Sequence, residues 1–112
     1  MLYMVVEHFR QGDPRPVYRR FRERGRMAPD GLRYVSSWVT DDLRRCFQVM
    51  ECEDRQLLAE WTARWEDLIE FEVIPVVTSP EAAAAVAGTE GGAMSKLSPV
   101  ARHKGEQVIL TL

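Results

Sequence analysis

The chain has 112 residues, of which 46% are hydrophobic and 29% charged, and its formal net charge is −2. This is the composition of an ordinary soluble protein with one compact domain. No apolar run approaches the roughly 20 residues of a membrane span, and the N-terminal stretch MLYMVVEHF lacks the basic region and cleavage site of a signal peptide. With two cysteines and no export signal, we expect a cytoplasmic protein without membrane association.

Charge is distributed unevenly along the chain. Residues 10–26 carry seven arginines and two acids, whereas residues 41–72 carry ten acids and four arginines. Two oppositely charged helices lying side by side would explain this pattern, and an arginine face for nucleic acid is the alternative. The near-neutral total and the lack of Lys-rich or Gly-rich segments disfavour nucleic acid as a partner.

The first predicted elements are a strand and a helix. Residues 2–9 form a β-branched and aromatic run, which predicts a strand. Asp13 then stands where a helix N-cap is expected, and Pro14 occupies the first helical position, where its missing N–H is tolerated. We expect this helix to run to about Arg26, with Gly25 marking its end.

A hairpin and a second helix follow. Residues 32–39 and 44–52 predict two strands joined by a short turn. Asp54 is placed to cap the next helix, which we expect over residues 55–68. Its apolar residues recur at intervals of three and four, and they form one stripe: Leu57, Leu58, Trp61, Trp65 and Leu68.

The last elements complete a known order. Residues 70–78 predict a fourth strand, in which Pro75 indicates an edge position or a bulge. Residues 79–88 predict a short alanine-rich helix. The order β-α-β-β-α-β predicts an α+β, ferredoxin-like fold, an antiparallel sheet with helices on one face.

The C-terminal part differs in composition. Residues 1–88 are the predicted domain, and residues 89–105 are rich in Gly and small polar residues, which indicates a linker. Residues 106–112 have the composition of a strand. They are either a strand that adds to a sheet edge of its own subunit or of another, which would allow oligomers beyond a dimer, or a disordered tail.

The strands are apolar at both parities, as in YMVV, CFQVM and VIPVV. Helices cover only one face of the predicted sheet, so the other face would expose a large apolar surface. A two-fold dimer whose sheets face each other would bury it. We therefore expect a homodimer.

Four segments carry a family resemblance: MLYMVVEHF, RGRMAPDGLRYVSSWV, CFQVMEC and FEVIPVVTS. From Met1 to about Ala87 the chain resembles a bacterial family of small proteins known mainly as a domain of unknown function, which is similar in plan to the dimeric α+β barrel superfamily. That superfamily includes cofactor-independent monooxygenases, haem-degrading enzymes, polyketide cyclases and non-catalytic binders. The resemblance implies a pocket between sheet and helices in each subunit, and it does not choose an activity.

The two cysteines do not form a site within their strand. Six residues of strand separate Cys46 from Cys52 by about 20 Å, which is too far for a disulfide or for one shared metal. Alternation places both on one face with Gln48 and Met50. We expect buried thiols, and Gln48 is either a core amide bonded to a neighbour or a group that orients a ligand.

His8 is the candidate catalytic base, because it is the only histidine of the predicted domain and titrates near neutrality; a strand-end histidine is the alternative. No metal motif or phosphate loop accompanies it, so neither a metal nor a cofactor is expected. Bulky rings with a few polar groups suit a pocket wall. Tyr34 and Trp38 are expected on one face of their strand. The predicted ligand-binding residues are Tyr34, Trp38, Gln48, Trp61 and Trp65.

Two arginines of the basic segment, Arg22 and Arg26, either meet an anionic ligand at the pocket mouth or pair with acids of the second helix, which is the interpretation we favour. Two functions then remain open. The protein is a homodimeric binder of a small apolar or aromatic molecule, or it is a cofactor-independent monooxygenase or cyclase that acts on an aromatic or polyketide-like substrate with His8 as base.

Overall fold

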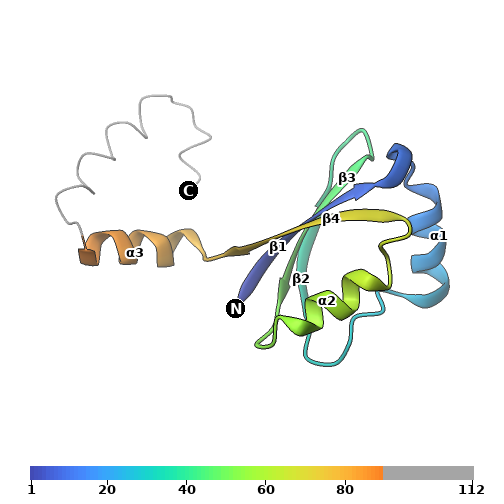
Figure 1. The fold of residues 1–112 in the computed structure, drawn as a ribbon. Coiled ribbons are helices and arrows are strands. Elements are labelled where there is room, and N and C mark those ends of the chain that lie inside the picture. Colours follow the sequence, from blue (N-terminus) through green and yellow to red (C-terminus); the bar gives the residue numbers. More distant parts are fainter. Residues whose placement is uncertain (90–112) are drawn as a thin grey trace. The chain divides into compact units, whose positions relative to one another are not determined.

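The computed structural model describes residues 1–89 of the chain (Figure 1). The chain divides into two compact units, Met1–Val76 and Val77 onward. The predicted linker beyond Thr89 and the predicted strand at 106–112 lie outside the described residues. Within residues 1–89, no helix combines the length and the apolar character that crossing a membrane requires.

The first unit contains one four-stranded antiparallel sheet with the order β2-β3-β1-β4. This order and the sequence β-α-β-β-α-β confirm the predicted ferredoxin-like plan. β4 pairs only with β1, so Pro75 lies on an edge strand, where a missing N–H is tolerated. The strands are β1 (Leu2–Phe9), β2 (Arg33–Val39), β3 (Arg45–Glu51) and β4 (Ile69–Val76).

A short 3-10 helix, Arg10–Gly12, connects β1 to the segment before α1 (Arg15–Arg24). As predicted, Asp13 stabilises the helix start, because its Oδ1 accepts a hydrogen bond from the backbone N–H of Arg15 at 3.0 Å. The helix ends two residues before the predicted Arg26. Gly25 follows with φ 72°, a left-handed conformation that interrupts the helix.

The second predicted helix is shorter than expected. The sequence predicts one helix over residues 55–68, whereas α2 covers Gln56–Ala63. The chain then continues in turns whose backbone amides bind carbonyls three residues back. Arg10 binds two carbonyls at the end of this segment. Its backbone N–H binds the carbonyl of Leu68 at 2.9 Å, and its Nε binds that of Glu66 at 2.9 Å.

The other two helix starts are also held by side chains. Asp54 Oδ1 accepts from the backbone N–H of Gln56 at 2.9 Å, as predicted. α3 (Ser79–Thr89) begins with a capping box, in which Glu81 accepts from the backbone N–H of Thr78 and the hydroxyl of Thr78 accepts from the N–H of Glu81. This helix belongs to the second unit.

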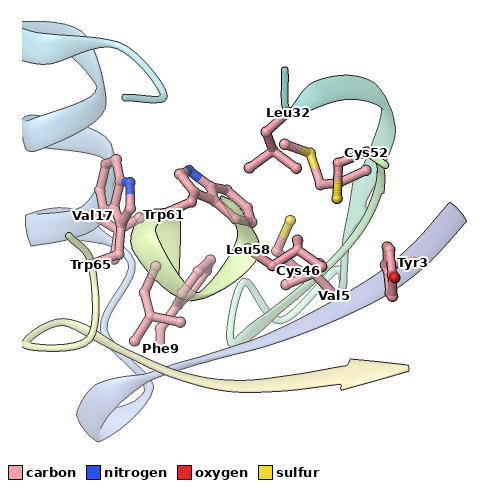
Figure 2. Packing of buried hydrophobic residues seen from close by; sticks show 12 residues of the cluster. Tyr3, Val5, Phe9, Val17, Leu32, Cys46, Cys52, Leu58, Trp61 and Trp65 are labelled. Atoms are coloured by element: carbon pink, nitrogen blue, oxygen red, sulfur yellow. The ribbon is translucent and has the colours of Figure 1, made fainter. Parts of the chain in front are cut away.

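The core lies between one face of the sheet and the helices α1 and α2 (Figures 1 and 2). Strand residues alternate in burial, and the predicted row of β3 is confirmed, because Cys46, Gln48, Met50 and Cys52 are all buried. Figure 2 shows Phe9 and the indoles of Trp61 and Trp65 together in this layer. The helices contribute Val17, Leu58 and Trp61 to the same cluster.

A β-bulge changes the facing of β2. The register with β3 shifts between Tyr34 and Ser36, so Tyr34 lies opposite Met50, whereas Trp38 lies opposite Phe47. Met50 faces the helices and Phe47 faces away, because they differ in parity on β3. The prediction that Tyr34 and Trp38 share a face is therefore wrong, and the extra residue of the bulge is the reason.

The sheet face opposite the helices is apolar. Val6 is buried on it although it lies outside the core cluster, and Trp38 is 59% exposed. Residues that pair across neighbouring strands point to the same face of the sheet. The apolar side chains of this open face are Leu2, Met4, Val6, Trp38, Phe47, Val49, Ile74 and Val76.

Candidate functional site

A cavity of about 160 Å³ lies within the first unit, between the helix-facing side of the sheet and the segments around α1 and α2. Its wall is mainly apolar, with several aromatic rings and four polar side chains among the lining residues. The aromatic residues are Phe9, Tyr18, Phe21, Trp61 and Trp65, and the polar ones are Glu7, Arg26, Ser37 and Gln48.

Two indoles fix the loop that closes the cavity. Trp61 Nε1 and Trp65 Nε1 each donate a hydrogen bond of 3.0 Å to the backbone carbonyl of Arg26, which follows α1. Trp61 is 2% exposed and Trp65 4%, so both donors need an internal partner. Two bonds on one carbonyl hold the loop against α2 and the turns that follow it.

A buried carboxyl lies on the sheet side. Glu7 is 6% exposed and lines the cavity from β1, on the same face as Val5 and Phe9. Gln48 Nε2 donates a 2.6 Å hydrogen bond to Glu7 Oε2. Gln48 lies diagonally from Glu7 on the neighbouring strand β3, because Cys46 is the residue directly opposite Glu7.

Gln48 links this carboxyl to a cation. Arg26 Nε donates to Gln48 Oε1 at 2.8 Å, and the Arg26 guanidinium stacks 3.8 Å from the centroid of the Tyr34 ring. The amide of Gln48 is only 4% exposed, and it has a hydrogen-bond partner for both its nitrogen and its oxygen. Glu7, Gln48 and Arg26 form one polar chain, called here the carboxyl–amide–guanidinium chain.

The apolar surroundings change the acidity of the carboxyl. Burial raises the pKa of Glu7 from 4.5 to about 7, and it outweighs the hydrogen bond from Gln48 and the charge of Arg26, both of which lower the pKa. Glu7 is therefore close to half-ionised at neutral pH. A carboxyl poised there can both accept and return a proton.

The thiol beside it is not a nucleophile. Burial, reinforced by the charge of Glu7, raises the pKa of Cys46 to about 12. Because the thiolate is the reactive form, Cys46 contributes an apolar wall to the cavity rather than chemistry. Cys46 and Cys52 are both free, in agreement with the predicted buried thiols.

The predicted site residues separate into two groups. Gln48, Trp61 and Trp65 line the cavity, and Tyr34 lies beside it as the stacking partner of Arg26. Trp38 and His8 lie on the open face of the sheet. His8 pairs with Arg45 and Glu70 across its two neighbouring strands, on the opposite face from Glu7.

The arginines of the basic segment have different kinds of partner. Arg20 forms a two-bond ion pair with Asp67, with distances of 2.8 and 2.7 Å, in agreement with oppositely charged segments side by side. Arg26, in contrast, contacts Gln48 and Tyr34, so the favoured prediction that it pairs with an acid of the second helix is wrong. Its position beyond the helix end is the cause.

Glu7 is not among the site residues predicted from the sequence. The signal that points to it is its row, because Glu7 is the one charged residue beside the bulky Tyr3, Val5 and Phe9, although the alternate row of the strand is equally apolar. An acid in such a row is buried beside large apolar side chains. Within residues 1–89, no group of three or more His, Cys, Asp or Glu side chains is arranged to hold a metal.

The family model described as a domain of unknown function, DUF3303, matches residues 1–90. The chain belongs to the DUF3303 family. This match spans both the sheet unit and the described part of α3, and it includes every residue of the cavity. Comparison with curated proteins and with solved structures gave no match.

The buried carboxyl predicts a pH dependence for the stability of this DUF3303 domain. Between pH 4.5 and 7 the folded state keeps the Glu7 proton and the unfolded state releases it, so stability falls as the pH rises through this window. The shift corresponds to roughly 3 kcal/mol. Urea unfolding across the window should show the wild type losing about this amount relative to Glu7→Gln, which has no proton to lose.

An exposed glutamate of α2 gives the control. Glu60→Gln removes one charge from a side chain that is exposed in the folded state, so this variant should run parallel to the wild type. A wild-type curve parallel to that of Glu7→Gln from pH 4.5 to 7 would contradict the burial of an ionisable Glu7.

Proposed function

We propose that the protein is a homodimeric small-molecule-binding protein of the dimeric α+β barrel type, and that each subunit holds a ligand of one ring in the cavity between sheet and helices. The observation that carries this proposal is the cavity itself. Its aromatic walls meet a short chain of polar groups at one side, which is the usual composition of a small-molecule site.

The cavity volume supports a ligand of limited size. Apolar cavities of about 150 Å³ admit benzene, and this cavity measures about 160 Å³. One six-membered ring with a small substituent fits such a space, whereas the several rings of a polyketide exceed it. The exposed rings of Tyr18 and Phe21 line the cavity from α1, where a ligand would enter.

The composition of the wall supports a ligand with an oxygen atom. A purely apolar ligand would leave one oxygen of the buried Glu7 and the terminal nitrogens of Arg26 without a further partner, and buried polar groups favour hydrogen bonds. A ring that carries a hydroxyl or carbonyl group would meet them. The alternative of a monooxygenase or cyclase with His8 as base gains no support, because His8 lies on the other face of the sheet.

The open face of the sheet supports the dimer. Its centre is apolar, and charged residues lie toward its margins, with Arg45 on β3 and Glu70 and Glu72 on the edge strand. This is the arrangement of an interface with an apolar core and a polar rim. A second copy related by a two-fold axis would place the same surface against itself.

Ligand binding can be tested with acetophenone, a one-ring ketone. Titration followed by tryptophan fluorescence in a Trp38→Phe background, which leaves the two cavity indoles as reporters, should show saturable binding. Ser37→Leu extends a side chain into the cavity and should weaken binding roughly tenfold or more, which corresponds to about 1.4 kcal/mol. Ser36→Leu, on the opposite face of the same strand, is the matched control. Equal affinities for the two leucine variants would overturn the cavity as the binding site.

Dimerisation can be tested by sedimentation velocity. Val49→Lys places one lysine from each subunit on the apolar face of the proposed interface, and an uncompensated buried charge is strongly unfavourable. The dimer dissociation constant should rise by roughly two orders of magnitude. Leu43→Lys changes a turn residue that is 51% exposed, and it should leave the dimer intact. A wild-type protein that sediments as a monomer would refute the proposed interface.

A further inference from the structure

The carboxyl–amide–guanidinium chain contains the two groups that proton abstraction next to a carbonyl requires. One is a base inside an apolar cavity, and the other is a donor that stabilises the negative charge that develops on the carbonyl oxygen. Glu7 supplies the first and Arg26 the second. Both line the same cavity of about 160 Å³.

Glu7 retains a free oxygen for chemistry. Within residues 1–89, its hydrogen-bond partner is Gln48, which binds Oε2, and Oε1 has no protein partner there. The bond to Gln48 fixes the orientation of the carboxyl group, because the amide is itself held by Arg26. The carboxyl is thus oriented by one oxygen while the other remains available to a ligand.

Arg26 is fixed in place before any ligand arrives. Its carbonyl is held by two indole N–H groups, its Nε by Gln48, and its guanidinium plane by the Tyr34 ring. In the described part of the chain, its two terminal nitrogens make no hydrogen bond to protein. A donor held this way stabilises a developing charge without reorganising during the reaction.

Gln48 keeps the base and the donor apart. A direct ion pair between Glu7 and Arg26 would occupy the groups that a ligand needs, whereas the amide bonds each of them once. The remaining titratable groups around Glu7 are neutral. Tyr18 on α1 has a pKa raised further by burial, Cys46 on β3 is a thiol, and the nearby turns contribute indoles.

We propose that the cavity enolises a one-ring carbonyl compound, with Glu7 as the base and Arg26 as the donor to the carbonyl oxygen. This inference rests on the proposed function, since it requires a ring ligand in the cavity. Glu7 and Arg26 are then catalytic residues, and Gln48 is a positioning residue that orients both.

The step is balanced within the site. The Glu7 carboxylate takes a proton from the carbon next to the carbonyl, and a new O–H bond forms as the C–H bond breaks. The electron pair of that bond forms a carbon–carbon double bond, and the carbonyl oxygen takes up the negative charge beside Arg26. The Glu7 carboxyl then exchanges its proton with solvent and delivers a solvent proton to the same carbon, which exchanges the hydrogen there, or it returns the proton to another carbon of the unsaturated system, which isomerises the ligand. No oxidant or second reactant is consumed.

The acidity of Glu7 suits this cycle. Its pKa of about 7 leaves the carboxylate populated at neutral pH and makes it a stronger base than an ordinary glutamate. At ketone concentrations well below saturation, where the profile reports the free protein, the rate should therefore rise with pH through about 7 and then level off. A purely structural Glu7 would give no such profile.

The experiment uses acetophenone and cyclohexanone in D₂O with the full chain, and it follows the loss of the exchangeable protons by ¹H NMR. The wild type should accelerate exchange roughly a hundredfold over buffer. Glu7→Gln should bind both ketones and show the buffer rate. Arg26→Gln should lose at least tenfold of the acceleration, whereas Arg22→Gln, the same change on the exposed surface of α1, should match the wild type.

Three results would overturn the inference. Binding of the ketones without acceleration removes the enolisation and leaves the proposed binding function intact. Equal acceleration by the wild type and Glu7→Gln removes Glu7 as the base. Failure of both ketones to bind removes the proposed function together with the enolisation. The pH profile of the wild type provides a test that does not depend on whether a variant folds.

Discussion

The carbonyl oxygen of Arg26 accepts hydrogen bonds from two buried indoles, and the site depends on this contact. Trp61 and Trp65 come from α2 and the turns after it, whereas Arg26 belongs to the loop after α1. The two bonds therefore tie both helical segments together above the sheet. They satisfy two donors that burial would otherwise leave unpaired, and they hold the Arg26 side chain beside the cavity.

On the sheet side of the cavity, the carboxyl of Glu7 has an unusually high pKa. A glutamate beside an arginine normally keeps a low pKa, because the opposite charge favours ionisation. Here an amide stands between Glu7 and Arg26, and burial is the larger influence. The same spacing that allows the proton to remain on Glu7 also leaves one carboxyl oxygen and two guanidinium nitrogens without bonds to the described protein. These unbonded polar groups lower the stability of the free protein, and a ligand that bonds to them would restore part of it.

Alternation and capping predicted most of the fold. Asp13 and Asp54 indicate helix starts that the structure has, and period two places the row from Cys46 to Cys52 on the core side. The site was harder to predict, because facing in a strand reverses with a single residue. His8 is a candidate base by its chemistry, whereas Glu7, one residue earlier, faces the cavity. In β2 a bulge reverses the facing of Trp38 relative to Tyr34, and nothing in the local sequence marks it. Arg26 reaches Gln48 from a loop, and periodicity does not describe loops.

The central claim is that a one-ring ligand and an ionisable Glu7 share the cavity. The most direct measurement is a ¹³C NMR titration of the Glu7 side-chain carboxyl, with and without saturating acetophenone. The account predicts a free-protein pKa of about 7 and a higher pKa with ligand bound, because the ligand excludes water from the carboxyl. A titration near the ordinary value of 4.5, unchanged by acetophenone, would contradict it.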